Sequence, residues 1–288
     1  MSEKRKTIRH LIDEGADFLN EKGIPTPRLD AELLLAMTLH KDRSYLFMYP
    51  EEIIEGNLVS VYRERIEQRG MHKPFQYIVG NQEFMGLPFK VNSHVLIPRP
   101  DTEILIESVL ATIKDKNLSP LILDIGTGSG AISVSLAAYS DSTLYATDIN
   151  QDALALAKEN AIVNGVESQI TFLHGHLLEP VQGKKFDIIL SNPPYISKKD
   201  MEELPPSVKN YEPHQALYGG TDGLDFYREI IEKAPAFLRA KGWVFFEIGY
   251  NQGDLVKELF EKDGIFENVQ IMKDLSGLDR VVSAQWAH

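Results

Sequence analysis

The sequence predicts an α/β protein, in which a mostly parallel sheet is covered by helices and follows a small helical bundle. From Asp101 onward, short apolar runs of strand length alternate with segments of helical spacing, which is typical of a parallel sheet covered on both faces. The first 73 residues carry helical patterns instead. At 288 residues and 43% hydrophobic composition, the chain can form one large domain and one small one.

The N-terminal region, residues 1–73, has three predicted helices. They cover Lys6–Glu21, Arg28–Leu39 after two prolines, and the charged segment Glu55–Arg69 with apolar residues on one side. Short helices of this kind bury their apolar sides against each other. We therefore predict a helical bundle, which we expect to help recruit a partner.

A linker over residues 74–98 is predicted to form a short β-hairpin. Phe75–Val79 and Phe84–Val91 have strand-like composition around the turn residues Gly80-Asn81 and Gly86. The large domain then occupies residues 99–288. Its predicted strands are Leu121–Ile125, Thr143–Thr147, Gln169–Leu173, Phe186–Leu190, Gly242–Glu247, Phe266–Met272 and Arg280–Ala284.

A glycine-rich loop follows the first of these strands. Gly126-Thr127-Gly128-Ser129-Gly130 separates the apolar strand from a helix that begins at Ala131. Glycines let a ligand touch the main chain, and the N-terminus of the next helix attracts an anionic group. The loop therefore predicts a cofactor site.

The next strand ends at Asp148, an acid placed to take the hydroxyl groups of a ribose. Its alternative role is to cap the helix that starts near Gln151. Gly126, Gly128 and Ala131 also satisfy the dinucleotide pattern G-x-G-x-x-G/A, with this acid 22 residues after Gly126, so a nicotinamide enzyme is a competing interpretation. No lysine follows the glycines, which excludes a P-loop.

Asn192-Pro193-Pro194-Tyr195 directly follows the predicted strand that ends at Leu190. Two prolines force a stiff, extended exit and donate no N–H, so the main chain there offers carbonyl acceptors. A rigid corner rich in acceptors, beside an aromatic ring, suits a planar NH₂ group. This indicates chemistry on an amide or an exocyclic amine, whereas the alternative is a turn that merely ends a strand.

Together the two motifs resemble those of class I methyltransferases that act on amino groups. Further segments narrow the resemblance to the peptide chain release factor glutamine N5-methyltransferases, the HemK/PrmC group. They are Ile97–Glu103, Glu212-Pro213 with Ala216-Leu217 and Gly219-Gly220, Asp222–Leu224, Glu247–Gly249 and Asp279–Val282. The resemblance runs from about residue 5 to the end of the chain.

The resemblance implies a Rossmann sheet of seven strands whose last strand is antiparallel, and S-adenosylmethionine as cofactor. The substrate would be the glutamine of the Gly-Gly-Gln loop of class I release factors. Asn192 and Pro193 would accept the two amide N–H bonds, Tyr195 would fix the plane of the amide, and Pro194 would complete the substrate site. The implied cofactor residues are Gly126, Thr127, Gly128, Ser129, Gly130, Asp148, His176, Leu177 and Asn192. The family commonly has Gly-Asp where this chain has Gly175-His176, so the adenine contact differs here.

The sequence also suggests roles for Arg99, Glu247 and the segment 196–224. Arg99 is held between two prolines before a helix that Asp101 is expected to cap. It could orient the substrate loop or close over the cofactor carboxylate, and the alternative is a surface ion pair. Glu247 ends a strand beside the active corner and is interpreted as structural. Residues 196–224 are polar and rich in Pro and Gly, and we interpret them as a lid that docks the partner.

Composition excludes several classes of protein. The chain has no cysteine and no recognisable metal-ligand spacing, so we expect no metal site. It also has no apolar run of membrane-spanning length, so we expect no membrane-spanning helix. Residues 1–73 hold 12 Lys or Arg and 13 Asp or Glu, whereas the rest holds 18 and 29, a net charge of −11. An acidic domain disfavours duplex DNA, because phosphate binding needs cations. We expect a cytoplasmic monomer without direct nucleic-acid contacts. The rival functions are an adenine-N6 methyltransferase on DNA or RNA and a binding module without turnover.

Overall fold

The computed structural model of the chain describes residues 6–116 and 119–288. These residues form two compact units. One unit extends to Gly80 and includes the segment Pro206–Tyr211, and the other comprises Asn81–Pro205 and Glu212–His288.

The first unit is helical and has its own core. Its helices are α1 (Ile8–Glu21), α2 (Pro27–Leu39), α3 (Arg43–Met48), α4 (Gly56–Gly70), α5 (Phe75–Val79) and the short α9 (Pro206–Lys209). Apolar side chains of α1, α2 and α4 are buried together, and the buried Tyr62 donates from Oη to the carbonyl oxygen of Leu11 at 3.1 Å. The three predicted helices are confirmed. The sequence analysis missed α3, whose six residues are too few to show a helical period.

The prediction of a strand over Phe75–Val79 is wrong, because this segment is the helix α5. Pro74 precedes it, and Gly80 ends it with a left-handed φ of 78°, donating its N–H to the carbonyl of Gln76. The hairpin instead pairs β1 (Asn81–Phe84) with β2 (Leu87–Lys90). Its turn is Met85-Gly86, and both residues have positive φ, as a tight hairpin turn requires.

The second unit contains a seven-stranded sheet in the order β5-β4-β3-β6-β7-β9-β8. The strands are β3 (Leu121–Ile125), β4 (Thr143–Asp148), β5 (Ile170–His174), β6 (Phe186–Ser191), β7 (Leu238–Glu247), β8 (Phe266–Lys273) and β9 (Asp279–Trp286). The pairs from β5 to β7 are parallel, and β9 runs antiparallel to both β7 and β8. All seven predicted strands and the antiparallel last strand are confirmed.

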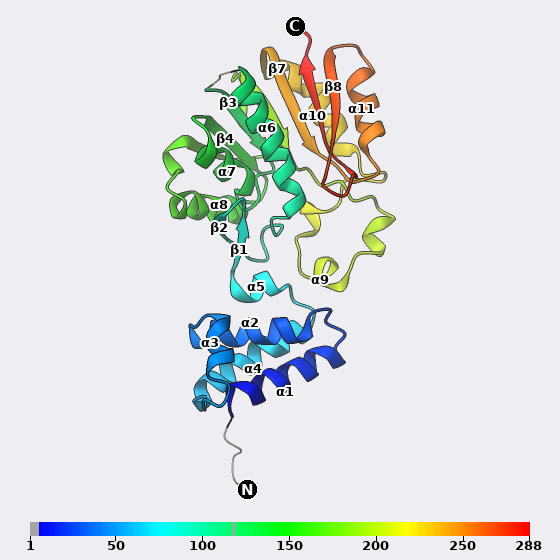
Figure 1. The fold of residues 1–288 in the computed structure, drawn as a ribbon. Helices are drawn as coiled ribbons and strands as arrows, with labels where there is room; N and C mark the ends of the chain where they lie inside the picture. The colour runs from blue at the N-terminus through cyan, green and yellow to red at the C-terminus, as the bar shows by residue number, and fades with distance from the viewer. Residues whose placement is uncertain (1–5, 117–118) are drawn as a thin grey trace. The chain divides into compact units, whose positions relative to one another are not determined.

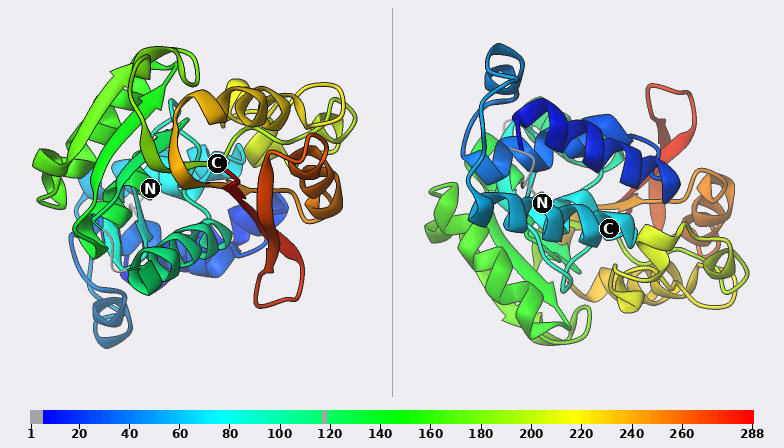
Figure 2. Two further views of the ribbon diagram at one scale, coloured as in Figure 1. Left: turned by 90° about the horizontal axis from the view of Figure 1, so that it is seen from above. Right: turned by 90° about the horizontal axis from the view of Figure 1, so that it is seen from below.

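Helices cover both faces of this sheet (Figures 1 and 2). Side chains of α6 (Glu103–Lys116), α7 (Ala131–Tyr139) and α8 (Gln151–Val163) share one core with Ile188 and Leu190. Side chains of α10 (Asp225–Lys233) and α11 (Gly253–Glu261) share the other core with Ile189. Successive residues of β6 point to opposite faces, which explains why its central run Ile188–Leu190 is apolar without alternation.

Short 3-10 turns lie between these elements. They are η1 (Pro100–Thr102), η2 (Glu167–Gln169), η3 (Glu179–Val181), η4 (Asp200–Glu202), η5 (His214–Ala216) and η6 (Ala234–Ala236). The expectation that Asp101 caps a helix is wrong: Arg99 precedes η1, and no side chain caps it. The Asp101 carboxylate pairs instead with Arg280 at 3.1 Å, because an ionic partner on β9 lies within its reach.

The sheet order creates the position for a site. β3 and β6 are adjacent, and their next neighbours, β4 and β7, lie on opposite sides of the pair. Connections that leave neighbouring strands in opposite directions open a crevice at the carboxyl ends of those strands. The glycine loop after β3 and the Asn192 corner after β6 both begin at this point. Within the described ranges, no helix combines the length and apolarity needed to cross a membrane.

Candidate active site

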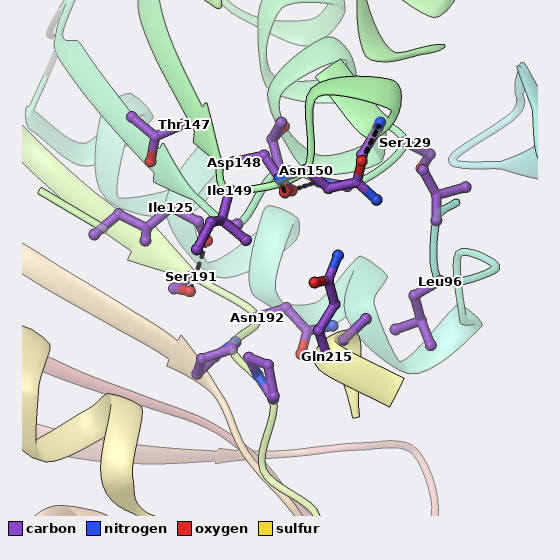
Figure 3. A pocket seen from close by; sticks show the side chains of 18 of the residues that line it. Leu96, Ile125, Ser129, Thr147, Asp148, Ile149, Asn150, Ser191, Asn192 and Gln215 are labelled. Carbon is purple, nitrogen blue, oxygen red and sulfur yellow. Dashed lines mark hydrogen bonds between the residues drawn. The ribbon is translucent and has the colours of Figure 1, made fainter. Parts of the chain in front are cut away.

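A cavity of about 280 Å³ lies in the second unit, where β3, β4 and β6 end (Figure 3). It brings together most of the predicted site residues: Gly126, Thr127, Gly128, Ser129, Asp148, His176, Leu177, Asn192, Pro193 and Pro194. Figure 3 shows the side chains of Asp148 and Asn150 on one side of the cavity and those of Asn192 and Gln215 on the other. Gly130 and Tyr195 are outside the lining.

The glycine loop is anchored through its main chain. The N–H groups of Gly126 and Thr127 both donate to the carbonyl oxygen of Thr147, at 2.8 and 3.0 Å. The Thr127 hydroxyl donates to Asp124 Oδ2 at 2.6 Å, beneath the loop. Burial raises the pKa of Asp124 to about 7, and the nearby Asp148 adds to the rise. The loop is therefore fixed before any ligand arrives.

The three glycines of the loop have different surroundings. Gly126 and Gly128 have φ of +73° and +56°, and a Cβ on either would meet no protein atom within 4 Å. Both line the cavity, so this space is open to a ligand that approaches the main chain. Gly130 also has positive φ, but a Cβ there would lie 3.1 Å from Ala157 Cβ. Gly130 thus permits close packing of the loop against α8.

Asp148 is held by main-chain donors at the end of β4. Its Oδ2 accepts from the N–H of Gly128 and its Oδ1 from the N–H of Asn150, each at 2.8 Å. The Ile149 N–H is a third main-chain donor to this carboxyl group. A carboxylate has about four acceptor positions, so about one remains for a ligand hydroxyl. Burial raises the pKa of Asp148, and these hydrogen bonds oppose the rise.

The alternative role of Asp148 as a helix cap is excluded. The side chain of Asn150 caps α8 by accepting from the N–H groups of Asp152 and Ala153, at 2.9 and 3.4 Å. Asn150 also lines the cavity. Asp148 therefore does not cap α8, and it lines the cavity together with the glycine loop.

A buried asparagine ties the glycine loop to the hairpin. Asn160 on α8 accepts from Lys90 N–H at 2.7 Å and donates to Lys90 O at 3.0 Å and Ser129 O at 2.8 Å. Its side chain is fully buried. These three bonds hold β2 and the loop in one arrangement.

The loop after β5 presents Leu177 and His176 to the cavity. Leu177 has a left-handed φ of 46°. A Cβ added to Gly175, two residues earlier, would lie only 2.5 Å from the Pro180 side chain, so the loop is tightly constrained. His176 Nδ1 lies 3.7 Å from Glu229 Oε1. Leu177 lines the cavity with the apolar side chains of Leu96, Ile125 and Ile149. Together they form walls suited to a flat aromatic ring.

These features fit S-adenosylmethionine, the cofactor implied by the resemblance. The bare main chain at Gly126 and Gly128 permits close approach, Asp148 keeps an acceptor position for a ribose hydroxyl, and apolar walls accommodate an adenine ring. Among the described residues, no three His, Cys, Asp or Glu side chains form a metal-binding group.

The Asn192 amide is oriented by residues on two other elements. Its Nδ2 donates to the hydroxyl of Thr102, at the end of η1, at 3.3 Å. Both side chains hydrogen-bond to the carboxyl group of Glu247, the last residue of β7, and these bonds lower its pKa. Burial outweighs them and raises the pKa of Glu247 to about 7.

Tyr195 is fixed by its main chain rather than by the cavity. Gln252 Nε2 donates to the carbonyl oxygens of Tyr195 and Gly223, at 3.1 and 3.3 Å, while its Oε1 accepts from Gly249 N–H at 2.9 Å. The Gln252 side chain is therefore a clamp on the chain that leaves Pro194. Burial raises the pKa of the half-buried Tyr195, so its phenol is neutral at physiological pH.

Arg99 forms an ion pair in which the acid is buried, whereas the Arg99 side chain itself is 38% exposed. Its guanidinium hydrogen-bonds to Glu212, whose side chain is 2% exposed. This pair joins the segment before η1 to the loop over residues 196–224, which also closes on itself through Ile196 N–H to Leu217 O at 2.9 Å. Arg99 and Gln215 both line the cavity.

Five residues of the site were not predicted from the sequence: Thr102, Asn150, Asn160, Gln215 and Gln252. Thr102 lies within the quoted segment Ile97–Glu103, and the Glu212–Leu217 segment includes Gln215, so the motif residues pointed to their neighbourhood. Asn160 lies within α8 and Gln252 directly precedes α11, and no sequence pattern marks either residue.

Comparison with known proteins agrees with the two units. Residues 10–80 match the family described as PrmC N-terminal domain, and residues 100–204 match the methyltransferase small domain. Relatives named release factor glutamine methyltransferase include one from Geobacter sulfurreducens, which is 40% identical over 99% of both chains. One from Moorella thermoacetica is 42% identical over 95% of this chain and 96% of its own, and one from Bacillus anthracis is 42% identical over 94% and 96%.

Among solved structures, a methyltransferase from Pyrococcus furiosus superposes with a TM-score of 0.52 at 19% identity, covering 70% of this chain and 90% of its own. This likeness concerns the fold.

Proposed function

The chain belongs to the release factor glutamine methyltransferase family, and we propose that it methylates N5 of the glutamine in the Gly-Gly-Gln motif of class I release factors. It is an enzyme that uses S-adenosylmethionine. The observation that carries the proposal is the Asn192-Pro193 corner, which opens into the same cavity as the glycine loop. An acceptor corner beside a cofactor loop suits transfer to an amide nitrogen.

The cofactor, when bound, supplies an electrophilic methyl group on a sulfonium sulfur. We assign its binding to the loop Gly126–Gly130 and to Asp148, with His176, Leu177 and Asn192 at the cavity wall. Gly130 acts through loop packing against Ala157 in this proposal, because it does not line the cavity.

The substrate amide must be activated by orientation. Its nitrogen is a poor nucleophile because the lone pair is delocalised into the carbonyl. Asn192 Oδ1 and the carbonyl oxygen of Pro193 would accept its two N–H bonds and favour a pyramidal nitrogen as the new bond forms. Holding nitrogen and carbon about 3–3.5 Å apart removes much of the entropic barrier.

Pro194 and Tyr195 complete the proposed substrate site. Pro194 lines the cavity, and the Tyr195 ring, half-buried and fixed by the Gln252 clamp, would pack on the substrate amide. As the N–CH₃ bond forms and the S–CH₃ bond breaks, the nitrogen loses a proton, which we assign to water. No protein base is required in this scheme.

We also propose a division of labour along the chain. Residues 1–73 would recognise the substrate, residues 74–98 would link, and residues 99–288 would carry the transfer. The loop over residues 196–224 would dock the release factor. We infer a cytoplasmic monomer that makes no direct nucleic-acid contacts, since the second part of the chain carries a net charge of −11.

The test is mass spectrometry of a class I release factor after incubation with the enzyme and labelled S-adenosylmethionine. We expect one added methyl group on the Gly-Gly-Gln glutamine, absent when Asn192→Ala replaces the wild type. Duplex DNA and RNA, offered in parallel at low salt, should stay unlabelled. Label on adenine with none on the release factor would contradict the proposal and favour the rival nucleic-acid function.

A further inference from the structure

A buried carboxyl group lies behind the Asn192 corner and has no part in the transfer scheme. Glu247 is the last residue of β7, which pairs with β6 in the sheet, and it is only 2% exposed to solvent. Its carbonyl oxygen accepts from Tyr227 Oη at 2.9 Å, which fixes the main chain there. One carboxyl oxygen, Oε2, is buried without a hydrogen-bond partner among the described residues. Burying such a group is costly, so its side chain needs an explanation.

Donor and acceptor counting shows what the carboxyl group can do from this position. Asn192 Nδ2 donates to Thr102 Oγ1 at 3.3 Å, and both side chains hydrogen-bond to the Glu247 carboxyl group. An ionised carboxylate can only accept. Thr102 must then donate its O–H to Glu247 and accept from Asn192, and the Asn192 amide must turn its NH₂ toward Glu247.

The same counting determines the free side of the amide. Asn192 Nδ2 donates to Thr102 Oγ1 and faces the Glu247 carboxyl group, and the planar amide directs Oδ1 the other way. Asn192 lines the cavity. If the Asn192 amide were turned round, its NH₂ group would face the NH₂ group of the substrate carboxamide. Two hydrogen-bond donors would then oppose each other.

We propose that Glu247 is a positioning residue, whose carboxylate, together with Thr102, holds the Asn192 amide with Oδ1 toward the substrate. The inference rests on the proposed function, since it assigns the group that keeps the acceptor in place for that reaction. Glu247 acts through Asn192 and does not touch the substrate itself.

The charge state of Glu247 then controls the corner. A protonated carboxyl donates a hydrogen bond and pairs well with an Asn192 amide that has turned its oxygen inward. Burial raises the pKa of Glu247 to about 7, and the charge of Asp101 adds to the rise. The Arg280 guanidinium and the two hydrogen bonds lower it. The activity should therefore fall as the pH drops through this range.

Two phenols and a second acid also face this region. The pKa values of Tyr195 and Tyr227 are raised by burial, so both stay neutral near pH 7. Arg280 also forms an ion pair with Asp274, in which Nη2 lies 3.0 Å from Oδ2. The pKa of Asp274 is lowered mainly by main-chain hydrogen bonds and further by Arg280. Glu247 is thus the group of this cluster whose protonation changes near neutral pH.

The first test compares Glu247→Gln with the wild type on a release factor between pH 5.5 and 8.5. At pH 8 we expect kcat to fall roughly tenfold, because a neutral amide orients Asn192 less strongly than a carboxylate. The affinity for S-adenosylhomocysteine should stay within about twofold. The acid limb of the wild-type profile should disappear in the variant.

Matched variants separate positioning from folding. Glu32→Gln replaces another glutamate with a 2% exposed side chain, one that is ion-paired with Arg28 and Arg43 in the first unit, and should keep the wild-type acid limb. Thr102→Val should lower kcat as Glu247→Gln does, whereas Thr102→Ser, which keeps the hydroxyl, should restore it. A wild-type kcat and acid limb in Glu247→Gln would overturn the proposal.

A readout without catalysis distinguishes this inference from the proposed function. In the wild type, the Asn192 side-chain NH₂ protons should exchange slowly with solvent by NMR at pH 8, and faster in Glu247→Gln and Thr102→Val. If the wild type fails to methylate the release factor, the function is wrong, but protected protons would still support the positioning. Equal exchange in wild type and variants would contradict it.

Discussion

The Gly128→Ala substitution tests the cofactor cradle most sharply. Gly128 has a φ of +56°, lines the cavity, and has no protein atom within 4 Å of the position of a Cβ. An added methyl group therefore strains the main chain and projects into open space. We expect a small loss of stability and a large loss of cofactor affinity.

The two magnitudes follow from different causes. A left-handed alanine costs about 1–2 kcal/mol, partly offset by about 0.4–1 kcal/mol from the less flexible unfolded chain. A net loss of ~1 kcal/mol lowers Tm by about 2–4 °C in a domain of this size. A methyl group forced against a closely fitted ligand costs about 1–3 kcal/mol, which corresponds to roughly 5- to 150-fold in Kd.

Gly264→Ala is the matched control. Gly264 has a φ of +63° and equally open surroundings, but lies between α11 and β8 outside the cavity. Both variants should lose the same stability by thermal unfolding. Calorimetric titration with S-adenosylhomocysteine should show weaker binding for Gly128→Ala alone. Wild-type affinity in Gly128→Ala, or equal weakening in both variants, would refute the cradle.

Three further substitutions test other parts of the site. Asn192→Ala should lower kcat by about 10²–10³-fold, with a much smaller change in S-adenosylhomocysteine Kd, because it removes an acceptor used in the transition state; an unchanged kcat would exclude that role. Gln252→Leu should lower the free energy of unfolding by about 2 kcal/mol in urea titrations and also lower kcat, because it releases the carbonyl of Tyr195. If kcat stays at the wild-type value, the clamp is only structural. Burial raises the pKa of Asp124 from 3.8 to about 7, so its stabilising contribution is full below about pH 4 and is lost as the pH rises through 7. Asp124→Asn should therefore show a smaller fall in unfolding free energy than the wild type between pH 5 and 7.5, and parallel curves would disprove the assigned cause.

The strands could be predicted from the sequence because their apolar runs are bounded by clear turn residues. Leu121–Ile125 is the same in prediction and structure, and its glycine loop follows at once. The prediction for Phe75–Val79 failed because a five-residue segment with four aromatic or β-branched residues fits a strand or a helical turn equally well. Only the packing of Phe75, Ile78 and Val79 against the core of the first unit and the left-handed Gly80 decide for the helix.

The support behind Asn192 could not be predicted from sequence for a topological reason. Thr102 and Asn192 are 90 residues apart, and Glu247 lies on a third element. They meet because β7 pairs with β6 and η1 lies at the same end of the sheet, which depends on strand order rather than on local pattern. The same strand end made Glu247 look structural when the sequence was considered by itself.

The most direct test of the proposed methyl transfer is a crystal structure with S-adenosylhomocysteine and a release factor bound together. We expect the glutamine carboxamide to lie in the cavity, with its nitrogen about 2.7–3.2 Å from both Asn192 Oδ1 and the carbonyl oxygen of Pro193. That nitrogen should face the sulfur of the bound product. A glutamine held elsewhere, or an Asn192 that offers its NH₂ to the substrate, would contradict the proposed transfer.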